Sequence, residues 1–158
     1  MADEKYTTAK VVYDTACEAL TERGWKYEGD LETLRIKTGA VGEDLPMEII
    51  IDVNADRQLF LVISPLPLKV PEDKRVDLAV AISVINNQLI DGSFDYDMRD
   101  GKILFRLTSS FIDSKISKEA ITYMIMCSCS TIDDYNDKLL LLAKGMLSLE
   151  QFLADEMN

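Results

Sequence analysis

The chain has 158 residues, of which 47% are hydrophobic and 28% are charged, and these are the proportions of an ordinary folded domain. Its 28 acidic and 17 basic side chains leave a formal net charge of -11, which opposes binding to nucleic-acid phosphates and to anionic lipid headgroups. A chain of this length can bury enough surface for one autonomous core. We therefore expect a single domain over residues 1–158, with a core over about residues 9–146 and a helical extension over 147–158, and we expect no nucleic acid and no membrane as partner.

Histidine is absent, and cysteine occurs only at Cys17, Cys127 and Cys129. The absence of histidine removes the commonest general base, every nucleophile paired with histidine and the commonest metal ligand. Cys127 and Cys129 lie about 200° apart around a predicted helix, so their thiols do not converge on one ion. We expect no catalytic residue, no cofactor and no metal. An odd number of thiols and short apolar runs predict a cytoplasmic protein.

The first half of the chain predicts one helix and three strands. Thr7 or Thr8 can cap a helix over residues 9–23, which Gly24 ends. Three short segments rich in β-branched and aromatic residues follow, separated by turn formers, and they predict antiparallel strands. These segments are residues 31–38, 47–53 and 58–64.

The second half predicts a helix over residues 71–90, a hairpin of strands 93–97 and 102–107, and a long helix from Ser117 to Ala143 or Lys144. The long helix is expected to break near Ser130, with Thr131 capping the second part and Asp133 and Asp134 at its start. A capping box over residues 148–151 predicts a short terminal helix. The order α-β-β-β-α-β-β-α predicts an α+β fold: an antiparallel or mixed five-stranded sheet with helices largely on one face.

The segment DYDMRDG, residues 95–101, poses a choice between a calcium loop and a hairpin turn. An EF-hand loop needs oxygen ligands at positions one, three and five and a glycine at position six. Counting from Asp95 places Arg99 at position five, and counting so that Gly101 is sixth makes Tyr96 and Met98 the first ligands. Both registers fail, so the spacing argues against calcium.

A hairpin through residues 98–101 accounts for the same residues without a metal. It places Phe94 opposite Phe105, with the aromatic side chains on one face, and it brings Arg106 diagonal to Asp95. Lys102 then lies across from Asp97, and Gly101 supplies the positive φ that closes the turn. We therefore predict a structural turn.

Both faces of the predicted sheet carry large apolar side chains, because apolar residues occupy both alternating sets of positions in residues 47–53 and 58–64. The helix over residues 71–90 is also apolar almost all round, a pattern typical of helices that are covered on both sides. One sheet face can pack on the helices, and the other needs a second subunit, a partner segment or the C-terminal tail. The candidate contacts are Ile50, Phe60, Val62, Val80 and Val84.

Residues 85–106 resemble the central signature of the YbjN-type family of bacterial sensory transduction regulators. The shared features are an asparagine at the end of a helix, Gly-x-Phe, an acidic strand, a short turn with glycine and an aliphatic-Phe-Arg strand. They fall at Asn86 or Asn87, Gly92, Phe94, Asp97, Gly101, Ile103, Phe105 and Arg106. The resemblance covers about residues 9–146, and it implies a small dimeric protein with a fold similar to type III secretion chaperones, which binds protein without catalysis.

We therefore expect a non-enzymatic protein-binding regulator or chaperone-like adaptor. It would act as a cytoplasmic homodimer and hold a protein client or regulatory partner on apolar sheet or helix surfaces. An apolar patch with an acidic rim suits a partner segment with apolar anchors and basic flanks. The alternative is a carboxylate-dependent hydrolase or a small-ligand-binding domain that uses Asp95 and Asp97.

Overall fold

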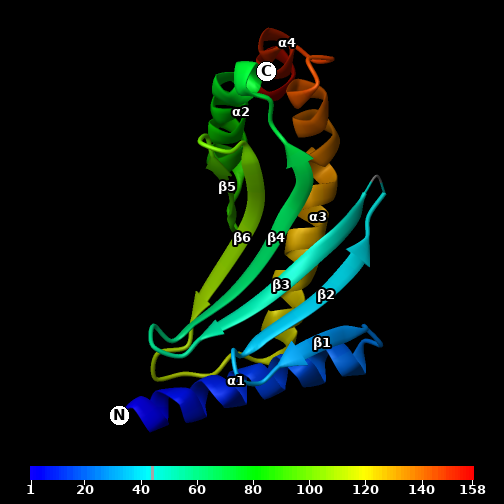
Figure 1. Cartoon of the computed structure of the whole chain (residues 1–158). Helices are drawn as coiled ribbons and strands as arrows, with labels where there is room; N and C mark the ends of the chain where they lie inside the picture. The colour runs from blue at the N-terminus through cyan, green and yellow to red at the C-terminus, as the bar shows by residue number, and fades with distance from the viewer. Residues whose placement is uncertain (44) are drawn as a thin grey trace.

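The computed structural model describes residues 1–43 and 45–158, which form a bent antiparallel sheet with helices on one side (Figure 1). The helices are α1 (Ala2–Glu22), α2 (Arg75–Gln88), α3 (Lys118–Ala143) and α4 (Leu149–Met157), with a 3-10 turn, η1 (Glu72–Lys74), before α2. The strands are β1 (Tyr27–Asp30), β2 (Arg35–Val41), β3 (Pro46–Asn54), β4 (Leu59–Lys69), β5 (Ser93–Asp97) and β6 (Lys102–Ser110).

The sheet has the order β1-β2-β3-β4-β6-β5, and each neighbouring pair is antiparallel. The first four strands lie in chain order, and after α2 the chain returns so that β6 pairs with β4 and β5 forms the edge. The predicted α+β class is confirmed, but the predicted number of five strands is wrong, because β1 was missed. Its sequence, YEGD, is short and mostly exposed, and it therefore lacks the apolar alternation that predicts a strand.

The core lies between the sheet and the helices that cover one of its faces. In Figure 1, α3 runs along the back of β4 and β6, and α1 crosses the end of the sheet near β1. Ile49, Ile51, Phe60 and Val62 point to this covered face, and each is 0% exposed. Burying an aliphatic or aromatic side chain of this size contributes roughly 1.5–3 kcal/mol.

Helix α1 begins well before the predicted start near residue 9. The hydroxyls of Thr7 and Thr8 donate to the carbonyl oxygens of Asp3 and Glu4, at 2.7 and 3.0 Å. Both threonines therefore lie inside the helix and do not cap it. The prediction was wrong because a threonine hydroxyl can bond either forward, as a cap, or back to the carbonyl four residues earlier.

Helix α3 is continuous, so the predicted break near Ser130 and Thr131 is wrong. The predicted cap at its start is present, since Ser117 Oγ accepts a hydrogen bond from the backbone N–H of Ala120 at 3.0 Å. Thr131 is buried in mid-helix on the core side. Asp133 and Asp134 therefore lie on a helix side and not at a helix start.

The terminal extension forms α4 and packs against α2. Gly145 follows α3 with φ +72°, and Ser148 caps α4 by accepting a hydrogen bond from the N–H of Gln151 at 3.1 Å. Phe152 is 1% exposed and anchors the extension. Across residues 1–43 and 45–158, none of the helices has the length and apolar character needed to cross a membrane.

The hairpin of β5 and β6 has the predicted register. Phe94 pairs with Phe105, Asp95 with Leu104 and Asp97 with Lys102. Gly101 has φ +77°, and its N–H donates to the carbonyl oxygen of Asp97 at 2.8 Å, closing the turn. The rings of Phe94 and Phe105 meet edge to face in the core, with their centroids 5.1 Å apart. The structural interpretation of residues 95–101 is confirmed.

Candidate functional site

The aspartates of the β5–β6 hairpin are paired with cations. Besides its ion pair with the Arg99 side chain, Asp97 accepts a hydrogen bond from the backbone N–H of Arg99 at 2.9 Å. Within the part of the chain that the structure describes, no three Cys, Asp or Glu side chains gather as metal ligands would. The geometry favours a turn over a hydrolytic or small-ligand site at Asp95 and Asp97. The ion pairs are Asp95–Arg106 at 3.0 Å, Asp97–Arg99 at 2.8 Å and Asp100–Lys102 at 3.8 Å.

The electrostatics of this turn also oppose acid catalysis. Hydrogen bonds from the side chain and backbone of Arg99 lower the pKa of Asp97 from 3.8 to about 2. A general acid works best when its pKa lies near the working pH, and a carboxyl this acidic has no proton to give near neutrality. Asp97 therefore acts as a fixed negative charge that holds Arg99 in the turn.

The thiols are also poorly suited to chemistry. Cys17, Cys127 and Cys129 are free and half-buried. Burial raises the pKa of each thiol. Since the thiolate is the nucleophile and the metal ligand, these cysteines are weakly reactive near neutral pH.

The structure separates the five residues that the sequence suggested as partner contacts. Phe60 and Val62 are 0% exposed in the core and do not reach the surface in this fold. Ile50 lies on the opposite sheet face and is partly exposed. Val80 is 38% exposed on the outer side of α2, and Val84 lies one turn further along, half-buried. Only the last three can contribute to a binding surface.

Among the residues that the structure describes, no helix covers the face of β3, β4 and β6 that lies opposite α3 (Figure 1), and we call it the open sheet face. Apolar side chains form a strip along its middle, and each of them is partly exposed. Ile50 lies beside Ile63 in the register, and Pro65 lies beside Leu104. The strip consists of Ile50, Leu61, Ile63, Pro65 and Leu104.

Ion pairs lie on both sides of this strip. Arg35 Nε lies 3.6 Å from Asp52 on one side, and Arg106 Nη2 lies 3.0 Å from Asp95 on the other. Both pairs combine opposite charges, so this rim carries little net charge although the chain as a whole carries -11. An apolar centre with a polar, charge-balanced rim is typical of a protein interface.

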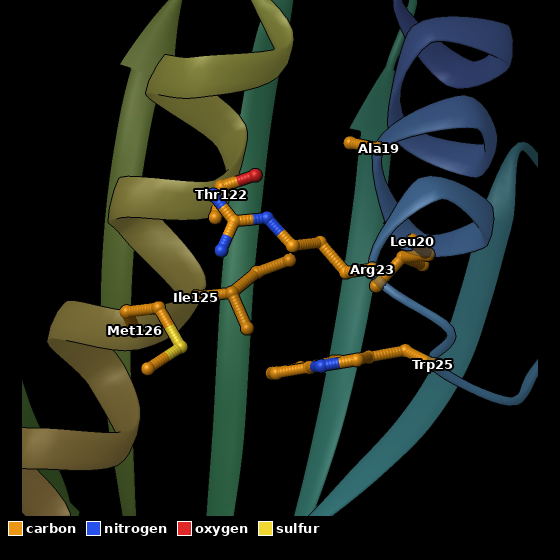
Figure 2. Close-up of a pocket in the computed structure, with 7 residues that line it drawn as sticks. All are labelled: Ala19, Leu20, Arg23, Trp25, Thr122, Ile125 and Met126. Atoms are coloured by element: carbon orange, nitrogen blue, oxygen red, sulfur yellow. The ribbon is translucent and has the colours of Figure 1, made fainter.

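A second surface feature lies between the end of α1 and the outer side of α3. Figure 2 shows the Arg23 side chain extending from α1 towards Thr122, and the Trp25 ring reaching below it towards Ile125 and Met126. Together these side chains enclose a hollow of about 30 Å³. Its remaining lining residues are Ala19 and Leu20.

This hollow adjoins a wider groove, because Trp25 and Met126 line both. The groove has a volume of about 490 Å³ and runs from Trp25 to the β2–β3 connection. We call the hollow and the groove together the Trp25 groove. The rest of the groove is lined by Ala40, Val41, Glu43, Cys129, Ser130, Asp133 and Asp134.

The sequence predictions missed the Trp25 groove because three distant segments build it. Residues 19–25, 40–43 and 122–134 meet only when α1, the β2–β3 hairpin and α3 pack together. The available signal was Trp25, the single tryptophan of the chain, which directly follows Gly24 outside any periodic segment. Trp25 is partly exposed, which makes it available to a ligand.

An α+β protein with one covered and one open sheet face is the class that this fold defines. The family model YbjN, described as "Putative bacterial sensory transduction regulator", matches residues 13–141, and the chain belongs to this family. The resemblance predicted from residues 85–106 is thereby confirmed. The family description names a regulator, which fits a non-enzymatic regulatory role.

The chain is also similar in structure to YbjN from E. coli, whose crystal structure is described as that of "a putative transcription regulator". The TM-score is 0.60 at 16% sequence identity, over 80% of this chain and 92% of that chain. At this identity the likeness concerns the fold. A comparison with curated proteins found no match.

Proposed function

We propose that the protein is a non-enzymatic, protein-binding regulator or chaperone-like adaptor that acts in the cytoplasm as a homodimer. The observation that carries the proposal is the open sheet face, on which Ile50, Ile63 and Leu104 form part of an apolar strip that no helix of residues 1–43 and 45–158 covers. Apolar side chains that gather on one uncovered face mark an interaction surface.

The exposed area of the chain is large enough to supply an interface with a second copy. A compact monomer of 17.8 kDa exposes about 8000 Å², whereas this chain exposes 9162 Å². The excess of roughly 1200 Å² is more than the approximately 800 Å² that each partner buries in a standard interface. The balanced ion pairs at the rim also let two copies approach without strong repulsion, although each carries -11.

The proposal also concerns the surface of α2 as a contact for a client protein. Val80 and Val84 on α2 remain candidate partner contacts, because Val80 is exposed and Val84, which packs against the core, is only partly buried. If the fold resembles type III secretion chaperones as predicted, the homodimer would hold an extended client segment. Affinity purification from the native cell, followed by mass spectrometry, would identify such a client. A client that binds the wild-type chain and dissociates from a Val80→Glu variant would support this role for α2.

The homodimer is tested by replacing one isoleucine on the open sheet face with a charged residue. We expect Ile63→Glu to convert a dimer into a folded monomer, because a buried, unpaired carboxylate costs several kcal/mol at an interface. The control is Ile90→Glu, since Ile90 is 99% exposed and lies outside the sheet. Sedimentation velocity gives the mass, and circular dichroism verifies the fold.

A dimeric Ile90→Glu variant beside a monomeric Ile63→Glu variant supports the proposal. A wild-type chain that sediments as a monomer at high concentration overturns the homodimer. An Ile63→Glu variant that remains a dimer overturns the assignment of the interface to the open sheet face.

A further inference from the structure

We infer that the Trp25 groove is a docking site for a basic segment of another protein, one that inserts an apolar side chain beside Trp25 and places lysine or arginine at the acidic end. This inference rests on the proposed function in taking the ligand to be a protein. It concerns a surface that differs from the open sheet face, so the two can be tested apart.

The apolar end of the groove fits the tip of one side chain. Trp25, Ile125 and Met126 line the hollow together with the cationic side chain of Arg23, and Met126 is 51% exposed although it is apolar. Figure 2 shows the Trp25 ring reaching across from the α1 side towards α3, so that an inserted group would contact both sides. Tryptophan and methionine suit such contacts, because a ring gives a large rigid surface and a thioether adapts to irregular shapes.

The other end of the groove is acidic and lacks internal cations. Glu43, Asp133 and Asp134 line it, and none of these carboxylates has a lysine or arginine nitrogen within 4.0 Å among residues 1–43 and 45–158. Asp133 Oδ1 accepts a hydrogen bond from the backbone N–H of Glu43 at 3.1 Å, which ties the β2–β3 connection to α3. The Asp133 carboxylate is thus held in place, none of the three is neutralised by an ion pair within the described residues, and a cationic ligand would complement them.

The adjoining sheet edge offers backbone contacts to the same ligand. Strand β1 pairs with β2 only from Arg35 to Thr38, so Gly39, Ala40 and Val41 have no strand partner on that side in the described part of the chain. Val41 is 92% exposed and, with Ala40, lines the groove. An extended segment could therefore pair with this edge while its side chains enter the groove.

These features separate the Trp25 groove from the dimer surface. The rim of the open sheet face is balanced in charge, whereas among the described lining residues of the Trp25 groove three carboxylates at the far end outnumber one cation, Arg23. A second copy of this chain, at -11, would meet the acidic end with repulsion. A basic segment of a different protein fits the groove better.

The single tryptophan makes the inference directly measurable, because Trp25 emission reports on the groove alone. The probes are short synthetic peptides with central leucines and lysines placed on either side. The matched peptides replace the lysines with glutamates or the leucines with serines. We expect a leucine–lysine peptide to shift Trp25 emission saturably, and both matched peptides to bind at least about tenfold more weakly.

Two variants locate the binding, each with a matched control. Asp134→Lys and Met126→Ser are expected to weaken binding of the leucine–lysine peptide by about tenfold or more. Glu72→Lys on η1 and Met157→Ser on α4 make the same kinds of change at exposed positions outside the groove and should leave binding unchanged.

A glutamate peptide that binds as tightly as its lysine counterpart would overturn the inference. So would unchanged binding to Asp134→Lys, or no emission shift with any leucine–lysine peptide at millimolar concentration. Sedimentation of the same samples separates this result from the proposed homodimer. A dimer without peptide binding counts against the groove alone, and a monomer that binds peptide counts against the homodimer alone.

Discussion

Gly101 lies where the β5–β6 turn meets the end of β4, in a conformation that strongly favours glycine. Its φ is +77°, and a Cβ added there would lie 2.4 Å from the carbonyl oxygen of Val70 and 3.0 Å from its nitrogen. The backbone contact is close because Val70 N–H donates to the carbonyl oxygen of Gly101 at 2.9 Å. The family resemblance at this position thus has a steric cause.

Replacing Gly101 with alanine is predicted to destabilise the fold by about 3 kcal/mol or more, because backbone strain and an overlap with Val70 add together. The control is Gly24→Ala, since Gly24 also has a positive φ, +69°, but a Cβ there would meet nothing within 4 Å. The Gly24→Ala variant should lose only about 1 kcal/mol in the free energy of unfolding. Chemical denaturation measures both, and equal losses would contradict the steric account.

The Asp97–Arg99 pair predicts a pH dependence of stability. Asp97 has a pKa of about 2 in the folded chain against an ordinary value of 3.8, so its ionised form favours the folded state. This contribution is present above pH 3.8 and is lost as the pH falls towards about 2. Arg99→Gln should raise the pKa of Asp97 towards 3.8 and weaken the pH dependence in that range.

An NMR titration of the Asp97 carboxyl carbon measures this pKa directly. Arg57→Gln is the matched control, because Arg57 is exposed and lies at the opposite end of β4. If Asp97 titrates near 3.8 in the wild type, or if Arg99→Gln leaves its pKa unchanged, the ion pair in the turn is not formed in solution.

At the scale of the elements, α4 shows how the extension is held. Phe152 is buried, Gln88 Nε2 donates to the carbonyl oxygen of Glu156 at 3.1 Å, and Lys138 pairs with the Glu156 carboxylate. These contacts join α4 to α2 and α3. The extension therefore covers part of the apolar surface of α2 and leaves the sheet face open.

We predict that Phe152→Ala destabilises the fold by about 3 kcal/mol, because it leaves a cavity between α4 and α2. Met157→Ala truncates an exposed side chain of the same helix and should change the stability by no more than about 0.5 kcal/mol. Thermal and denaturant unfolding measure both variants. Similar small effects would mean that α4 is not anchored as described.

The elements also show which features a sequence can predict. The β5–β6 register was predictable because it depends on pairs less than fifteen residues apart, such as Phe94 with Phe105. The side of the sheet that α3 covers was not predictable. Alternation in residues 58–64 separates Phe60 and Val62 from Ile63, but only the packing of a distant helix decides which set is buried.

The same reasoning explains the misplaced contacts and the missed groove. Both sheet faces are apolar, and for this reason Phe60 and Val62 were predicted to lie on a binding surface. The helices cover the sheet face that carries these two residues, so both are buried. The Trp25 groove depends on contact between the end of α1 and α3, a tertiary arrangement that local periodicity does not encode. Sequence patterns fix the local geometry of elements, and packing decides which surfaces remain.

At the scale of the whole molecule, two surfaces of different character remain exposed. The open sheet face is apolar with a balanced rim, and the Trp25 groove is acidic at one end and mostly apolar at the other, where Arg23 is the one charged residue of the described lining. A symmetric copy suits the first, and a basic segment suits the second. This division would allow a dimer to carry two docking sites at once, one on each copy.

The most direct test of the homodimer is chemical cross-linking at one position of the open sheet face. In a chain with Cys17, Cys127 and Cys129 replaced by alanine, a short bismaleimide should link two copies of an Ile63→Cys variant. Ile63 lies in the middle of the apolar strip, and the two-fold axis of a symmetric interface passes through the centre of that interface. An Ile90→Cys variant, exposed outside the sheet, should form no covalent cross-link at the same concentration. Cross-linking of Ile63→Cys but not of Ile90→Cys is the result that we predict, and failure of Ile63→Cys to cross-link would contradict a dimer formed through this face.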